Sequence, residues 1–160
     1  MISINTKILI LRPIWEVFKY ITRPENNEQW QYGSLASVRI SKGNIKLGTL
    51  FSSFGHFMGR RIQGDFEVTE FEVNKKYSFK TFSGPIQLRT SYTFETVGSG
   101  TNLAVSTQIN PGVFFKLVDP IVAKVAKKQF TENLATLKQI LEATEIKHEQ
   151  KQPSPLKSRP

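Results

Sequence analysis

The N-terminal segment alternates apolar and polar side chains. Its apolar positions are Ile2, Ile4, Ile8 and Ile10. This period of two predicts a half-buried β-strand. After Pro13 the spacing becomes helical, and the apolar residues there are Ile14, Trp15, Val17, Phe18 and Ile21. We therefore expect a short amphipathic helix that ends near Thr22, followed by a second short helix that Pro24 opens and Trp30 closes.

The segment from Leu35 to Ile109 repeats the alternating pattern, with turn residues between the repeats. Turns are predicted at residues 42–44, 74–76, 84–85 and 98–100, which are rich in Gly, Asn and Pro. Glycines at 48, 55 and 59 interrupt one long strand candidate and suit bends in a curved sheet. The pattern predicts six strands here, and therefore seven strands in all.

A long helix follows the predicted sheet. Pro111 and Gly112 end the last strand, and residues 113–118 are expected to form one or two helical turns. Asp119 is a suitable N-cap for a helix that runs to about Glu145. Its apolar face comprises Ala123, Ala126, Phe130, Leu134, Leu137 and Leu141. An antiparallel sheet with one apolar face would bury this stripe by curving around the helix, which predicts an α+β fold.

The composition indicates a single domain with a buried core. The chain has 160 residues, 39% of them hydrophobic, and 12 are phenylalanines, so a mostly disordered chain is excluded. We assign residues 1–145 to this domain and residues 146–160, with three prolines and few apolar side chains, to a disordered basic tail. The absence of cysteine excludes disulfides, thiolate metal sites and a thiol nucleophile. No apolar run approaches the roughly 20 residues that span a bilayer, and no signal peptide is evident, so we expect a soluble cytoplasmic protein.

The formal net charge is +9, and residues 146–160 contribute three of these positive charges. The remaining basic residues are scattered and do not form a stripe interleaved with exposed aromatic residues, so we expect no nucleic-acid partner. Weak attraction to an anionic membrane or protein surface remains open.

The order of the predicted elements resembles the helix-grip fold of the SRPBCC superfamily, which includes START-like and polyketide cyclase/dehydrase-like proteins. The resemblance rests on four stretches, RPIWEVFKYITRPENNEQW, DFEVTEFEVNKKYSFK, YTFETVGSGTNLAV and NLATLKQILE, within residues 2–142. It implies a curved seven-stranded antiparallel sheet wrapped around the C-terminal helix, with an apolar cavity between them. Members include polyketide cyclases and dehydratases, carriers of quinones or lipids, and plant hormone receptors.

The resemblance also implies where a ligand would bind. Trp30 would point into the cavity mouth, or it would fill the core beneath a loop. The other expected wall residues are Phe54, His56, Phe79, Tyr92, Phe94, Phe115, Ile121, Val122 and Val125. Their apolar type alone does not distinguish a cavity wall from a filled core.

Few side chains suggest catalysis. His56 is the candidate general base, because its parity with Leu50, Phe54 and Met58 predicts that it faces inward, although a lone histidine is more often structural. Tyr92 should also face inward and either orient a ligand or bond to the backbone, and Thr90 or Thr107 could supply further polar contacts. No cluster of residues has metal-ligand spacing, and no cofactor motif is present. The carboxylates Asp65, Glu67, Glu70 and Glu72 are expected to face solvent.

These patterns support three hypotheses. The first is binding or transport of a hydrophobic small molecule, such as a lipid, a quinone or a polyketide-like compound, by a monomer or homodimer without a cofactor. The second is a cyclase or dehydratase that uses His56 or Tyr92. The third is a carrier or interaction module at an anionic surface. We favour the first and leave enzymatic activity undecided, because one fold hosts all three.

Overall fold

The structure, a computed structural model, describes residues 1–57, 59–110 and 119–149. Within them the strands are β1 (Ile2–Ile10), β2 (Ser34–Arg39), β3 (Leu50–Phe57), β4 (Arg60–Glu72), β5 (Lys76–Ser83), β6 (Gln87–Val97) and β7 (Gly100–Asn110). The helices are α1 (Ile14–Ile21), the 3-10 helix η1 (Pro24–Asn26), α2 (Asn27–Trp30) and α3 (Asp119–Glu149). The predicted order of one strand, two short helices, six strands and a long helix is confirmed.

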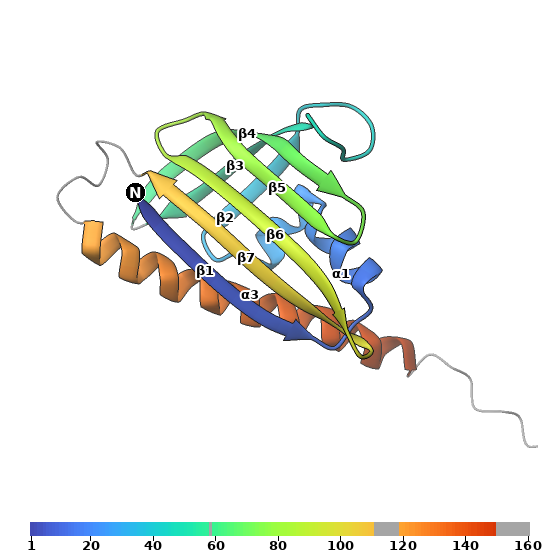
Figure 1. The fold of residues 1–160 in the computed structure, drawn as a ribbon. Coiled ribbons are helices and arrows are strands. Elements are labelled where there is room, and N and C mark those ends of the chain that lie inside the picture. The colour runs from blue at the N-terminus through green and yellow to red at the C-terminus, as the bar shows by residue number, and fades with distance from the viewer. Residues whose placement is uncertain (58, 111–118, 150–160) are drawn as a thin grey trace, which may run out of the picture.

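The strands form one antiparallel sheet in the order β1-β7-β6-β5-β4-β3-β2, so β1 and β2 are its edges. The sheet is strongly curved (Figure 1). The pairing register shifts twice between β4 and β5 and once between β2 and β3. Such bulges bend a strand and increase its twist, which allows the two edges to approach each other.

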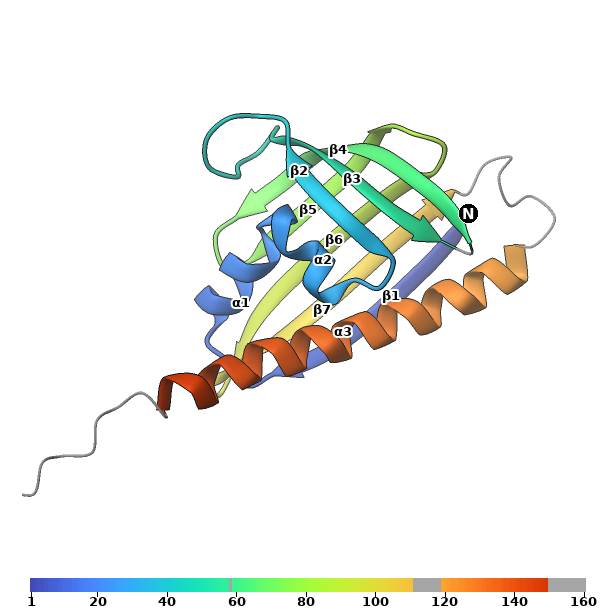
Figure 2. The ribbon, with the colours of Figure 1, turned by 180° about the vertical axis from the view of Figure 1, so that it is seen from behind.

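Helix α3 lies along the open side of the curved sheet, next to β1 (Figure 2). Its buried positions are Val122, Ala126, Leu134, Leu137 and Leu141. The end of β1 is held to α3 by two hydrogen bonds, from the Leu11 N–H to Glu142 (2.9 Å) and from Lys138 Nζ to the Leu9 carbonyl (2.6 Å). Helix α2 contacts both β2 and α3, so it bridges the far edge of the sheet to the helix.

The helix boundary differs from the prediction. Helix α3 continues to Glu149, four residues beyond the expected end at Glu145. The expected helical turn at residues 113–118 lies outside the described residues, and so does the part of the expected tail from residue 150 onward.

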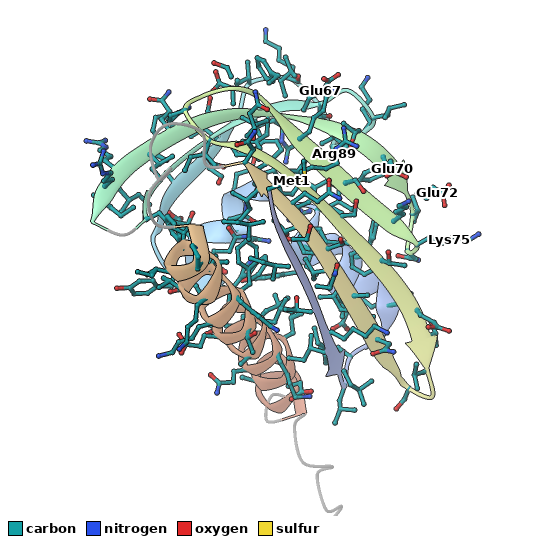
Figure 3. All side chains as sticks on the ribbon, turned by 60° about the vertical axis from the view of Figure 1, so that its left-hand side comes forward. Met1, Glu67, Glu70, Glu72, Lys75 and Arg89 are labelled. Carbon is teal, nitrogen blue, oxygen red and sulfur yellow. The ribbon has the colours of Figure 1, made fainter. Side chains whose placement is uncertain are left out.

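The outer face of the sheet carries charged side chains. Glu67, Glu70, Glu72 and Arg89 lie on this face, away from α3 (Figure 3). Glu70 forms an ion pair with Lys76 on the neighbouring strand (2.8 Å), and this hydrogen bond lowers the pKa of Glu70. The expectation that these carboxylates face outward is met, so they do not reach the space between sheet and helix.

Candidate ligand-binding cavity

A cavity of about 270 Å³ lies between the inner face of the sheet and the middle of α3. Its apolar lining residues are Trp30, Phe54, Phe57, Ile62, Phe66, Phe79, Ile86, Leu88, Val105, Ile109, Phe130 and Leu134. Its polar side chains are those of Gln31, Tyr32, Ser34, Ser53, His56, Gln63, Thr90, Tyr92, Gln129 and Asn133. The resemblance implied a cavity in this place.

Strands β5, β6 and β7 form the floor of the cavity. Thr90 stands opposite Phe79 on one side and opposite Thr107 on the other, and the two threonine hydroxyls share a hydrogen bond of 3.1 Å. Both threonines are buried. Because each hydroxyl has a partner in the other, this pair is a satisfied part of the wall.

Aromatic rings form the wall toward β4. The rings of Phe66 and Phe79 meet edge to face at a centroid distance of 5.6 Å. Phe51 lies beside them, stacked on Phe66 at 5.3 Å, and is 1% exposed. These contacts hold the two lining rings in fixed orientations.

Trp30 closes the cavity at the end of α2. Its side chain is 4% exposed, belongs to the main hydrophobic core and lines the cavity, so the two roles expected for it are combined. The indole Nε1 atom is sealed from solvent and has no hydrogen-bond partner among the described residues.

The loop after α2 is tied to α3 at the edge of the cavity. The Tyr32 N–H donates to Asn133 Oδ1 (3.0 Å), and Gln129 Nε2 donates to the same oxygen (2.9 Å). The Tyr32 side chain is exposed. The main chain of this loop also meets β3, because the His56 N–H donates to the Gly33 carbonyl (2.7 Å). Residues 31–34 therefore form one rim of the cavity.

Tyr92 projects from β6 into the cavity. Its side chain is 4% exposed and its ring stacks on Tyr77 of β5 at 5.9 Å. Burial raises the pKa of Tyr92 well above the ordinary value of 10.0, so the hydroxyl stays protonated. The expected backbone partner for this hydroxyl is absent among the described residues. The hydroxyl oxygen is also not among the side-chain atoms that are sealed from solvent, so it faces the cavity.

The predicted orientation of His56 is wrong. In the register of β3 with β4, Phe51 stands opposite Phe66 and His56 stands opposite Arg61. Since Phe51 and Phe66 are stacked inside, the odd-numbered positions of β3 face inward, and His56 has the opposite parity; Phe54 shares that parity but is partly buried and still borders the cavity. His56 is exposed and meets the cavity at its rim. Both parities of β3 contain aromatic residues, so alternation did not identify the inner face.

The helix residues expected to line the cavity lie elsewhere. Ile121 and Val125 are 58% and 40% exposed, and Val122 packs in a separate cluster with Ile2 and Ile4. Each residue turns an α-helix by about 100°, so Ile121 and Val125 point away from the line that begins with Val122 and Ala126. The cavity meets α3 farther along, at Gln129, Phe130, Asn133 and Leu134.

Two further expected wall residues do not line the described cavity. Phe94 is buried against Phe18 of α1, with ring centroids 5.1 Å apart, because α1 covers that end of β6. Phe115 lies outside the described residues. The expected residues that do border the cavity are Trp30, Phe54, His56, Phe79, Tyr92 and Thr90. Thr107 supports Thr90 from behind.

The sequence reasoning missed several lining residues. Leu88, Val105 and Ile109 share strand parity with assigned residues, and Phe130 and Leu134 belong to the predicted apolar stripe of the helix. The signal was therefore present, but nothing in it showed how far along the helix the cavity lies. Phe66 alternates with Asp65 and Glu67, which were expected to face solvent, so it carried the same kind of signal, whereas the polar pair Gln129 and Asn133 had none.

The described residues contain no group of three or more His, Asp or Glu side chains placed to hold a metal ion. In the same part of the chain, no helix combines the length and apolar character that crossing a membrane requires.

Comparisons with known proteins agree with this geometry. The family model described as polyketide cyclase/dehydrase and lipid transport matches residues 1–142. No curated protein matches the sequence. A START superfamily protein from Mycobacterium smegmatis is similar in structure, with a TM-score of 0.78 and 12% identity over 90% of this chain and 99% of that one.

Two further solved structures are similar. The protein TTHA0849 from Thermus thermophilus gives a TM-score of 0.75 and 15% identity, covering 89% of this chain and 98% of that one. The di-domain ARO/CYC StfQ of the steffimycin biosynthetic pathway gives 0.67 and 14%, covering 89% of this chain and 45% of that one. At these identities the structural likeness establishes the fold alone. Together with the family match, it shows that this chain belongs to the polyketide cyclase/dehydrase and lipid transport family and has the helix-grip fold of the START and SRPBCC proteins.

Proposed function

We propose that this protein binds a hydrophobic small molecule in the cavity between its sheet and α3. The observation that carries the proposal is the cavity itself, about 270 Å³ in volume and lined mainly by aromatic and aliphatic side chains. Ligand sites are typically concave and mostly apolar, with a few polar groups that fix the orientation of the ligand. The family description, which includes lipid transport, supports the same function.

The structure favours binding over a cyclase or dehydratase activity. Such reactions need groups that remove and donate protons. The described lining residues include no carboxylate, and the one imidazole among them, that of His56, belongs to the outer face of β3. Burial raises the pKa of Tyr92, so its hydroxyl is a weaker acid than an ordinary tyrosine and stays protonated, which makes it unsuited to act as a base.

Native mass spectrometry of the purified protein tests the proposal directly. We expect a co-purifying apolar compound, which solvent extraction would release and identify by class. A Val105→Phe variant should lose this compound, because the larger ring would occupy space next to Tyr92. Val125→Phe is the matched control, since Val125 is exposed and does not line the cavity.

Equal retention of the compound by both variants would contradict binding in this cavity, provided that both melt cooperatively. Turnover of a polyketide-like substrate by the unmodified protein, abolished in Tyr92→Phe or His56→Ala, would instead establish the enzymatic alternative. Binding at an anionic surface stays a separate prediction, which truncation of the basic tail tests.

A further inference from the structure

The described part of the cavity lining is uncharged. Among the described residues that line the cavity, none is Asp, Glu, Lys or Arg. An ionised group that leaves water for an apolar site without an opposite charge loses much of its favourable hydration. A fatty acid carboxylate or an ammonium group would therefore find no counter-ion among the described residues that line this cavity.

Tyr92 provides a hydrogen-bond donor inside the same cavity. Its side chain is almost completely buried, and its hydroxyl has no partner among the described residues. The nearby Thr90 hydroxyl is already paired with Thr107, so it does not satisfy Tyr92. A ligand that displaces water from the cavity would leave the Tyr92 hydroxyl unpaired unless a ligand oxygen accepts its hydrogen bond.

The indole N–H of Trp30 is a second donor without a partner among the described residues, but it is less accessible to a ligand than the Tyr92 hydroxyl. Its Nε1 atom is sealed in the wall, so a ligand would reach it only after the indole had turned. The Tyr92 hydroxyl faces the cavity without such a movement. Trp30 is more useful as a reporter, because its ring lines the cavity whereas the other tryptophan, Trp15, is exposed and lies outside it.

We infer that, within the binding function proposed above, the cavity selects uncharged ligands that carry a carbonyl or ether oxygen, and that Tyr92 donates a hydrogen bond to this oxygen. Ketones, quinones, esters and lactones have this chemistry, whereas free fatty acids do not. The volume of about 270 Å³ lies just below the usual range of about 300–1,000 Å³ for ligand sites, which suits a compound of two fused rings.

Three compounds of nearly equal size separate the effect of an acceptor oxygen on binding from the effect of a charge. 2-Acetylnaphthalene is neutral and has an acceptor oxygen, 2-ethylnaphthalene has no acceptor, and 2-naphthoate is charged at neutral pH. Calorimetry would measure each dissociation constant, and the indole N–H signals in an NMR spectrum would report where each compound binds. We expect the Trp30 signal to move and the Trp15 signal to stay.

Unmodified protein should bind 2-acetylnaphthalene about three- to tenfold more tightly than 2-ethylnaphthalene, as a single hydrogen bond predicts. It should bind 2-naphthoate more weakly than either. Tyr92→Phe should abolish the preference for the acetyl compound and leave the affinity for 2-ethylnaphthalene unchanged. Tyr77→Phe is the matched control, because Tyr77 stacks on Tyr92 but does not line the cavity. This variant should still prefer 2-acetylnaphthalene over 2-ethylnaphthalene.

The possible failures can be told apart. Equal binding of the acetyl and ethyl compounds, a preference that survives in Tyr92→Phe, or tighter binding of 2-naphthoate would overturn the inference and leave the proposed binding function standing. Failure of all three compounds to bind or to move the Trp30 signal would overturn the binding function and, with it, the inference.

Discussion

The hydrogen bond between Thr90 and Thr107 allows a sharp test of how the cavity floor is stabilised. The two hydroxyls lie 3.1 Å apart on neighbouring strands, and both side chains are at most 2% exposed. Replacing one threonine by valine keeps the shape of the side chain but leaves the other hydroxyl without its partner. The unpaired group should cost about 1–3 kcal/mol of the free energy of unfolding.

The double variant Thr90→Val/Thr107→Val should behave differently. Both polar groups are then replaced by methyl groups, so neither hydroxyl remains buried and unpaired, and the change should be close to neutral. The sum of the two single losses should therefore exceed the loss in the double variant by about 2–6 kcal/mol.

Urea unfolding of the four proteins, followed by circular dichroism, would measure these differences. For a chain of this length, each kcal/mol corresponds to a shift of about 2–4 °C in Tm. Thr93→Val is the control, because Thr93 lies on the same strand but is exposed, and it should change stability by no more than about 0.5 kcal/mol. A double variant that loses the full sum of the two single losses would refute the reasoning.

Three further predictions concern the rim, the buried tyrosines and the tail. Gly55→Ala should cost about 1–3 kcal/mol in urea unfolding, because its methyl group would lie 2.6 Å from the main-chain oxygen of Gly33; unchanged stability would contradict this close approach. Burial raises the pKa of Tyr77 and Tyr92 above 10.0, so the unfolded chain loses these protons first as the pH rises. The free energy of unfolding should thus be unaffected below pH 10 and fall above it, and Tyr77→Phe should make this fall smaller. If the free energy of unfolding fell equally steeply with pH in both proteins at pH 10–11, the assignment to Tyr77 would be wrong. A chain that ends at Glu145 should melt within a few degrees of the full chain and bind anionic vesicles less at low salt, and a large fall in Tm would mean that residues after 145 stabilise the domain.

The sequence determined the architecture because each element has its own local signal. The alternation of isoleucines predicted β1, and Pro13 followed by helically spaced apolar residues predicted α1. The order of these elements narrows the possible packings, since a sheet with one apolar face and a helix with one apolar stripe must bury them against each other. The family match to residues 1–142 agrees with this reading.

The sequence also placed part of the cavity wall. Tyr92 was assigned to the inner face because it shares strand parity with Leu88 and Phe94, and its side chain is buried in the structure. Strand β3 has aromatic residues on both parities, so the same rule failed for His56, whereas Phe54 does border the cavity. The inner face of β3 was decided by the stacking of Phe51 on Phe66, a contact with the neighbouring strand that no local pattern contains.

Only the tertiary structure decided how far along α3 the cavity lies. The periodicity of a helix identifies its buried face, but not which turn of that face meets an empty space and which meets another side chain. Ile2 and Ile4 pack against Val122 near the start of α3, so that part of the core is filled. Farther along, Phe130 and Leu134 line the cavity together with Trp30 of α2 and with residues of distant strands, so its position depends on elements that lie far apart in the sequence.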